Sequence, residues 1–472
     1  MARKHSYLQE DDSDMTIKKY EEFISGNSSS GYFDVEEFKT IVEYYLRKGK
    51  TKDSSKALEM GMKLHPGSSA LQLKSAKLHL ACNNPMKAQR ILESITEEDN
   101  YDVELLKIDA LLRMERDRDA LEVHKRFLSM VNLKYTDFSY PEFAYQDVAH
   151  IYMSLRKFDT ATKILEEGTE NAPDNIDLLF ELAHCYEQTN NFEQAIETHQ
   201  RIIKIDPFVS EAWFNLGQIH FSLQNHLLAL EAYDYALAIN PDDALSQVQK
   251  GHVLLNSKRY EEAIAAYFEY RKISPEVFQI LNCIAECYEM LERYDDAFLC
   301  YKETLEHDSE DFDALTGAAI CLLEKEEYSA SMDYSQKATA IAPEQPDGWI
   351  YLGEAHVGLD NMKGALTAYL KAIECDAKQS ETLFAIGNIY LEEADYQSAL
   401  HYYTQAYEQN KELEYIDLFL SITRFKLNNI ETALTHLREA VDSDETTISL
   451  FLEICPEAAD LIANQGFSTQ TD

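Results

Sequence analysis

The cysteine, histidine and carboxylate side chains of this chain are numerous, but their spacing favours no catalytic or metal site. The eight cysteines are scattered, with no Cys-x-x-Cys pair. Cys283 and Cys287 stand four residues apart on one face of an expected helix, where core packing explains them better than a metal half-site without partner ligands. No Ser-His-Asp order, glycine-rich phosphate loop or His-Glu-x-x-His motif is present. With 84 Asp and Glu residues, pairing any two as acid and base would be arbitrary. We therefore predict no catalytic residue, no cofactor and no metal, and a chain that is not an enzyme.

The acidic charge of the chain is concentrated in one part of the sequence. Residues 1–140 carry 22 Lys and Arg against 24 Asp and Glu, a balance of -2, whereas residues 141–472 carry 21 against 60, a balance of -39. Nucleic acid would be repelled by the second part, because its binding depends on neutralising phosphates with Lys and Arg. Partners with basic surfaces would be attracted, although the same charge could serve only to solubilise the protein.

The sequence also predicts the cellular compartment. No apolar run approaches the roughly 18 residues that span a membrane. The N-terminal segment MARKHSYLQEDDSDM turns acidic after two basic residues and lacks the apolar region of a secretory signal. We expect no membrane span and a cytoplasmic location.

A 34-residue repeat governs the positions that could carry a binding site. Residues 210–243 read SEAWFNLGQIHFSLQNHLLALEAYDYALAINPDD. Steps of 34 from Gly217 meet only small residues, namely Ala149, Ala183, Gly251, Ala285, Ala319, Gly353, Gly387 and Ser421. Steps from Ala229 do the same at Ala161, Ala195, Ala263, Ala297, Ser331, Ala365, Ala399 and Ala433. Small residues at a fixed helical phase indicate close helix crossings.

The repeat resembles the tetratricopeptide (TPR) pattern W-x2-L-G-x2-Y…A-x3-F…A…P. Trp213, Leu216, Gly217, Ala229, Tyr233, Ala236 and Pro241 match it, and His220 stands where tyrosine is usual. The resemblance implies an all-α fold, a right-handed α-α superhelical solenoid of about twelve helix pairs with a C-terminal capping helix. Prolines in phase at 173, 207, 241, 275 and 343 would end the second helices.

The repeat pattern suggests a division of the chain into four parts. We expect an N-terminal tail and short helix at 1–37 and divergent, near-neutral repeats at 38–141, with Ala57, Ala88 and Ala120 at the second-helix small position. Nine regular, strongly acidic repeats would follow at 142–447, and capping helices with a tail at 448–472.

In TPR proteins the first helix of each pair lines a concave groove, which the resemblance carries over to this chain. Inner positions counted from Trp213 give groove candidates with acidic or polar edges and an aromatic floor: Asp177, Phe180, His184, Glu211, Phe214, Gln218, His252, Glu286, Asp347, Glu354, Glu381, Phe384 and Asn388. Such a groove suits a basic or apolar peptide or protein segment. The alternative is that these residues only pack between repeats. Zinc chelation by His150, His184 and His252 is disfavoured, because neighbouring repeats stand about 10 Å apart.

The predicted function is a scaffold or adaptor that binds a partner in this groove. The type of TPR domain that clamps carboxylates with basic residues is not favoured, because Asp, Glu and His occupy the inner positions here. Two alternatives stay open, a non-catalytic regulatory subunit of an enzyme complex and a self-associating structural protein.

Overall fold

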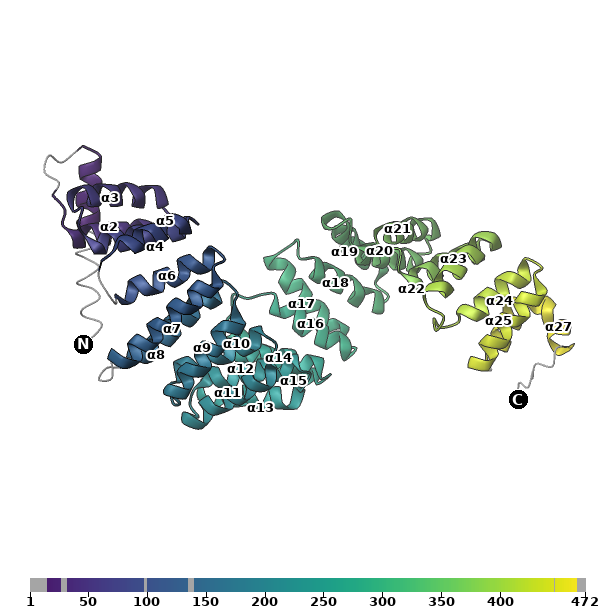
Figure 1. Ribbon diagram of the computed structural model, residues 1–472. Helices are drawn as coiled ribbons and strands as arrows, with labels where there is room; N and C mark the ends of the chain where they lie inside the picture. Colours follow the sequence, from purple (N-terminus) through teal and green to yellow (C-terminus); the bar gives the residue numbers. More distant parts are fainter. Residues whose placement is uncertain (1–14, 27–31, 97–99, 135–139, 445, 465–472) are drawn as a thin grey trace. The chain divides into compact units, whose positions relative to one another are not determined.

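The computed structural model describes residues 15–26, 32–96, 100–134, 140–444 and 446–464 (Figure 1). Within these residues the chain is helical and contains no β-strand. It divides into two compact units, Met1–Pro241 and Asp242–Asp472, which we describe separately. None of the described helices combines the length and apolarity that crossing a membrane requires.

Unit 1 contains a helix over residues 15–24 followed by six antiparallel helix pairs. The pairs are α2 (Val35–Arg47) with α3 (Thr51–Leu64), α4 (Ser69–Ala81) with α5 (Pro85–Ser94), α6 (Tyr101–Arg113) with α7 (Asp117–Lys134), α8 (Tyr140–Ser154) with α9 (Phe158–Asn171), α10 (Ile176–Gln188) with α11 (Phe192–Ile205), and α12 (Ser210–Ser222) with α13 (His226–Ile239).

Unit 2 contains six further pairs and a terminal cap. The pairs are α14 (Ala244–Asn256) with α15 (Tyr260–Ile273), α16 (Ile280–Met290) with α17 (Tyr294–His307), α18 (Phe312–Glu324) with α19 (Tyr328–Ile341), α20 (Pro346–Gly358) with α21 (Met362–Cys375), α22 (Ser380–Glu392) with α23 (Tyr396–Gln409), and α24 (Ile416–Lys426) with α25 (Ile430–Ser443). The cap consists of α26 (Thr447–Ile454), the short 3-10 turn η1 (Pro456–Ala458) and α27 (Ala459–Asn464).

The described residues thus confirm the predicted fold class, twelve helix pairs of the superhelical repeat type closed by C-terminal helices. The cap buries Phe451, Cys455 and Ile462 against Leu418 and Leu437 of the last pair, so the apolar end of the array is covered. Ala57, Ala88 and Ala120 are fully buried on α3, α5 and α7, as expected for the small position. Much of the predicted N-terminal tail, and the tail that follows the capping helices, lie outside the described residues.

The turn inside each pair contains a backbone conformation that the residue types do not predict. One residue there adopts a left-handed φ, and from Arg156 onward it recurs every 34 residues at Asn190, Gln224, Lys258, Glu292, Glu326, Asp360, Ala394 and Asn428. The conformation aims backbone N–H groups at the open carbonyls of the first helix; Asn225 N, for example, donates to His220 O at 2.8 Å. The residue types vary because these side chains are solvent-exposed and only the backbone is constrained.

In four of the described pairs the helix crossing places a glycine of the first helix beneath a tyrosine ring of the second. A Cβ added to Gly217 on α12 would lie 2.7 Å from Cε1 of Tyr233 on α13, closer than van der Waals contact allows. Tyr233 is fully buried, so its ring has no room to retreat. The same contact recurs in Gly251–Tyr267, Gly353–Tyr369 and Gly387–Tyr403.

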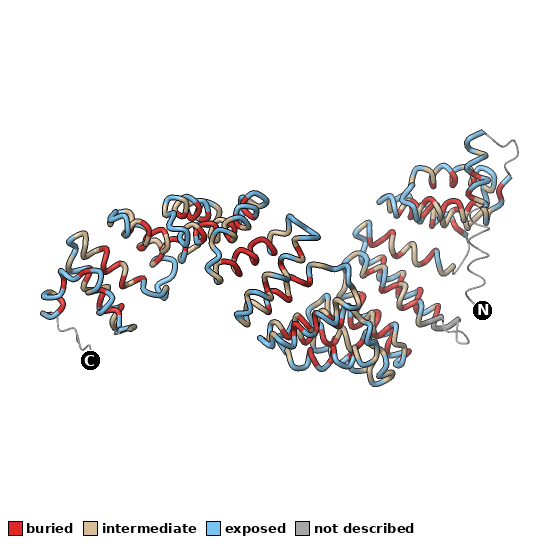
Figure 2. Tube along the Cα trace, turned by 180° about the vertical axis from the view of Figure 1, so that it is seen from behind, coloured by how far each residue is buried: buried red, intermediate tan, exposed pale blue. Residues whose placement is uncertain are grey.

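First helices line the inner face of the stacked pairs. Successive first helices contact one another, as α2 does with α4, α4 with α6, α16 with α18 and α18 with α20. Among the described helices, contacts between successive second helices are at most slight. Buried residues follow the helix sides that face neighbouring helices, and exposed residues follow the opposite sides (Figure 2). Side chains on the free side of the first helices are therefore the ones positioned to meet a partner.

Replacing Gly217 by Leu should destabilise unit 1 by about 1–3 kcal/mol, because the new side chain would force the Tyr233 ring and the two helices apart. Thermal unfolding followed by circular dichroism measures the effect. Gly67→Leu is the matched control, since nothing lies within 4 Å of a Cβ at that exposed turn. Equal melting temperatures for the two variants would contradict the proposed crossing.

Candidate partner-binding surfaces

The structure places all the predicted groove residues on first helices. Asp177, Phe180 and His184 lie on α10, and Glu211, Phe214 and Gln218 on α12, all in unit 1. The others belong to unit 2: His252 on α14, Glu286 on α16, Asp347 and Glu354 on α20, and Glu381, Phe384 and Asn388 on α22. The side chains of Asp177, His184, Glu211, Gln218, Glu286, Asp347, Glu354 and Glu381 are exposed, and the remaining five are half-buried.

The three predicted floor phenylalanines also pack against their own and neighbouring pairs. The Phe180 ring centroid lies 5.9 Å from that of His199, and Phe214 lies 5.9 Å from Tyr233. Phe384 lies 5.2 Å from Phe419 of the next pair. Each ring is therefore partly packed in the core and partly accessible at the surface.

Two polar inner residues are fixed by tyrosines from the core. The hydroxyl of Tyr267 pairs with Nδ1 of His252 at 2.9 Å, and that of Tyr403 donates to Oδ1 of Asn388 at 2.7 Å. Each ring reaches the inner face by passing over the glycine of its pair. Burial lowers the pKa of His252, which keeps it a neutral hydrogen-bonding group rather than a cation.

Unit 2 carries a group of carboxylates on four successive first helices, α16, α18, α20 and α22. Glu354 on α20 is solvent-accessible, yet desolvation in this crowded surface raises its pKa to about 7. The negative charges of Glu324 on α18 and Glu381 on α22 make smaller contributions to the same shift. On α16, desolvation raises the pKa of Glu286 and of Glu289, and Cys321 donates to Glu289 at 3.6 Å. We call Glu286, Glu289, Glu324, Glu354 and Glu381 the acidic inner cluster.

Sequence reasoning missed two members of this cluster, Glu289 and Glu324. Glu289 stands eight positions after Leu281, and Glu324 stands nine positions after Leu315; Leu281 and Leu315 are the residues equivalent to Trp213. The groove candidates were taken only from the positions two before, one after and five after each such residue. A count extended by one helical turn beyond the fifth position would have found both, because residues three or four apart share a helix face.

A separate cavity of about 740 Å³ lies on the inner face of unit 1, where the sequence predicted no groove residue. Its floor includes Leu73, Leu105 and Leu106. Charged side chains of both signs surround this floor: Lys39, Lys74 and Lys77 on α2 and α4, and Asp102, Asp109 and Asp147 on α6 and α8. The weaker repeat signal in this region gave no register from which to count inner positions.

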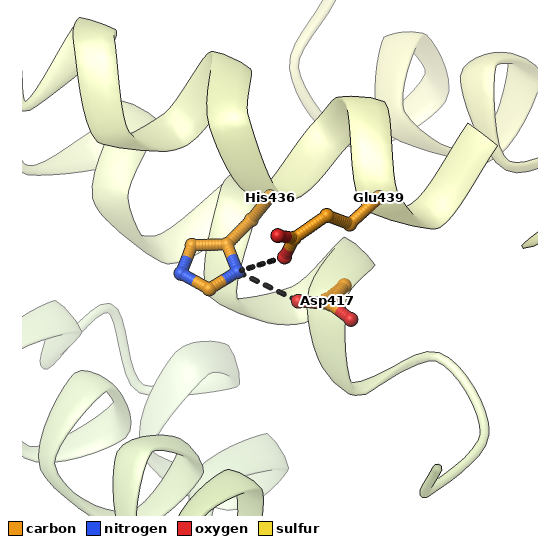
Figure 3. A group of neighbouring side chains, drawn as sticks. All are labelled: Asp417, His436 and Glu439. Atoms are coloured by element: carbon orange, nitrogen blue, oxygen red, sulfur yellow. Dashed lines mark hydrogen bonds and ion pairs between the residues drawn. The ribbon is translucent and has the colours of Figure 1, made fainter. Parts of the chain in front are cut away.

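One group of side chains in the last pair has the composition of a metal site. Asp417, His436 and Glu439 bring three donor atoms within 4.8 Å of one another, and no other such group occurs in the part of the chain that the structure describes (Figure 3). The cysteines form no such group there: all eight are free, and Cys287 is buried, in keeping with core packing.

Family comparisons match most of the regular array. Models of the tetratricopeptide repeat match residues 152–218, 210–243 and 368–401. A model described as ChAPs (Chs5p-Arf1p-binding proteins) matches residues 246–373. No curated protein sequence matches the chain significantly.

Comparison with solved structures gives matches of low identity. A tetratricopeptide repeat protein from Parabacteroides merdae is 18% identical, with a TM-score of 0.42, and the match covers 52% of this chain and 98% of that one. YrrB, described as a TPR protein with an unusual peptide-binding site, is 20% identical, with a TM-score of 0.36 and coverage of 40% and 98%. A chain of the APC/C hetero-tetramer Cut9-Hcn1 is 12% identical, with a TM-score of 0.39 and coverage of 83% and 96%.

The helix pairs, the 34-residue register of their small residues and the three matching repeat models together identify the chain as a tetratricopeptide-repeat protein.

Proposed function

We propose that this chain is a protein-interaction scaffold whose inner face in unit 2 binds a basic polypeptide segment that also carries apolar side chains. The observation that carries the proposal is the acidic inner cluster. Within the described residues, Glu286, Glu324, Glu354 and Glu381 have no ion-pair partner in the chain itself. Carboxylates gathered without a cation create a negative potential that a Lys or Arg side chain would relieve.

The raised pKa of Glu354 supports this choice of partner. At neutral pH a carboxyl group with a pKa of about 7 is only half ionised, because desolvation disfavours its charged form and the negative charges of Glu324 and Glu381 add to that effect. A bound cationic side chain would favour the ionised form and lower that pKa. Part of the affinity for a basic segment would therefore come from relief of repulsion that already exists in the free protein.

The apolar part of the proposed ligand is matched by the half-buried rings near one end of the cluster. Phe384 lies on α22 with Glu381, and its ring packs against Tyr403 and Phe419. A ring already held by its neighbours loses little freedom when a ligand covers it. An apolar side chain placed one or two residues from a Lys or Arg could reach both surfaces.

The family comparisons agree with a binding role for the same helices. The matched model of Chs5p-Arf1p-binding proteins covers residues 246–373, which include α16, α18 and α20 of the acidic inner cluster. The family is named for binding the proteins Chs5p and Arf1p. A helical-repeat fold of this kind is typically non-catalytic, and its chemistry is that of a scaffold.

Synthetic peptides test the proposal directly. Fluorescence anisotropy of the full chain should show binding of peptides that combine Lys or Arg with Leu or Phe, and weaker binding of equal-length peptides with Glu in place of the basic residues. Raising the salt concentration should weaken binding, because exposed charge pairs are screened. Preference for the acidic peptides, or no binding to either set, would overturn the proposal.

Charge reversal within the cluster should abolish the preference for basic peptides. The double variant Glu354→Lys, Glu381→Lys should lower affinity for a basic peptide about tenfold or more, because attraction is replaced by repulsion. Glu408→Lys, an exposed residue on the second helix α23, changes charge away from the inner face and should leave affinity nearly unchanged. Equal losses in the two variants would mean that only the net charge of the chain matters.

The affinity for a basic peptide should rise with pH between pH 6 and pH 8, by about threefold to tenfold. Glu354 has a raised pKa of about 7, so it is mostly protonated at pH 6 and mostly ionised at pH 8, and only the ionised form attracts a cation. Anisotropy titrations at several pH values measure this. Glu354→Gln cannot ionise and should flatten the dependence, whereas Glu408→Gln should keep it. If Glu354→Gln kept the full pH dependence of peptide affinity, a group other than Glu354 would be the one that titrates.

A further inference from the structure

The last helix pair departs from the repeat at a position that is almost always apolar. In each regular pair the positions concerned are the residue equivalent to Trp213 on the first helix and the residue nineteen positions later on the second helix. They touch in the pair of α14 and α15, where the Gln247 amide donates to the Ala266 carbonyl. In the regular pairs before the last these two positions hold Tyr145 and Ile164, Leu179 and Thr198, Trp213 and Ala232, Gln247 and Ala266, Leu281 and Cys300, Leu315 and Tyr334, Trp349 and Ala368, and Leu383 and Tyr402. In the last pair they hold Asp417 and His436. The fold does not require a charged residue here, since the other eight pairs form without one.

A third potential ligand stands beside this pair. Glu439 lies three residues after His436 on α25, a spacing that puts both side chains on one helix face. His436 Nδ1 lies 2.6 Å from Oδ1 of Asp417 and 3.4 Å from Oε2 of Glu439. All three side chains point toward a common centre between α24 and α25 (Figure 3).

We propose that Asp417, His436 and Glu439 bind a zinc ion, or a similar divalent transition metal, which joins the two helices of the last pair. One imidazole and two carboxylates are a donor set that Zn²⁺ accepts. Metal-ligand bonds of about 2.0–2.1 Å in a tetrahedral site separate the donor atoms by about 3.3 Å. The two separations measured from His436 lie on either side of that value, so small side-chain rotations would complete the geometry.

The surroundings of the three ligands favour a cation and leave room for a fourth donor. The side chains of His436 and Asp417 are 16% and 20% exposed, and the His436 ring packs edge-on against Tyr407 with 5.6 Å between centroids. Two ligands are therefore fixed, whereas Glu439, at 51% exposure, is free to close on the ion. Asp417 and Glu439 also border a cavity of about 340 Å³, from which water can reach the ion.

The net negative charge around the three ligands also favours binding of a cation. Besides Asp417 and Glu439, the described lining of this cavity includes Glu412, Glu414 and Asp444, with Lys411 as its one basic side chain. A divalent cation would offset both ligand carboxylates.

Zinc titration of the full chain, after removal of bound metals with a chelator, tests the proposal. Isothermal titration calorimetry should show one more equivalent of Zn²⁺ bound by the natural chain than by His436→Ala. Glu439→Gln should weaken this site about tenfold or more, since loss of even an outer-shell group typically costs that much. Zn²⁺ should also raise the melting temperature of the natural chain but not that of His436→Ala. Equal stoichiometry and equal affinity in the natural chain and both variants would overturn the proposal.

Controls separate this site from other metal-binding side chains. His150 forms an ion pair with Glu181 at 2.8 Å but belongs to no group of three donors in the described residues, so His150→Ala should bind as the natural chain does. Co²⁺ should give visible absorption without a thiolate charge-transfer band, because no sulfur takes part. A thiolate band alone would place the metal on cysteines and overturn the proposal. If His436→Ala unfolds, as circular dichroism would reveal, Glu439→Gln decides, because its half-exposed side chain is not needed for packing.

Discussion

Each helix pair depends on how closely its two helices approach. Where a tyrosine of the second helix lies over a glycine of the first, as Tyr233 does over Gly217, the backbones approach so closely that no Cβ fits between them. The rise of an α-helix and the length of the turn fix where this contact recurs along the chain. The left-handed turn residues and the prolines recur with the same 34-residue spacing as this contact.

The same contact connects the core to the inner face. A tyrosine that crosses a glycine carries its hydroxyl through the pair, and in two pairs that hydroxyl holds an inner polar residue, His252 or Asn388. Buried tyrosines therefore hold some of the polar side chains of the inner face in place. Among the described residues, Glu286, Glu324, Glu354 and Glu381 of the acidic inner cluster have no ion-pair partner in the chain, which leaves their charge available to a ligand.

Charge divides the inner face into surfaces of different character. The inner cavity of unit 1 carries lysines and aspartates around a leucine floor, whereas unit 2 carries the acidic inner cluster. A scaffold built this way would present different chemistry to different partners, because each surface selects its ligand by charge complementarity. The last pair differs again, since Asp417 and His436 stand where most other pairs hold uncharged residues, and with Glu439 they form the proposed metal site.

The sequence alone determined the helix pairs, their number and their register. Gly217, Ala229 and their equivalents identify the crossings because steric exclusion acts at fixed positions in every repeat, and a periodic constraint is visible as a periodic pattern. Placing the groove candidates on first helices followed from that register. The left-handed turn residues escaped notice, since Arg156, Glu292 and Ala394 share a backbone angle and no side-chain property.

Only the tertiary structure decided which side chains act on one another across repeats. The pKa of Glu354 depends on Glu324 and Glu381, which come from helices separated from it by a complete second helix in sequence. The cavity of unit 1 and the meeting of Asp417, His436 and Glu439 likewise require knowledge of distance and burial. The physical reason is that the steric constraint at a helix crossing acts at the same position of every repeat and so appears as a sequence pattern. The electrostatic environment of a side chain depends instead on all the groups near it in space, whatever their place in the sequence.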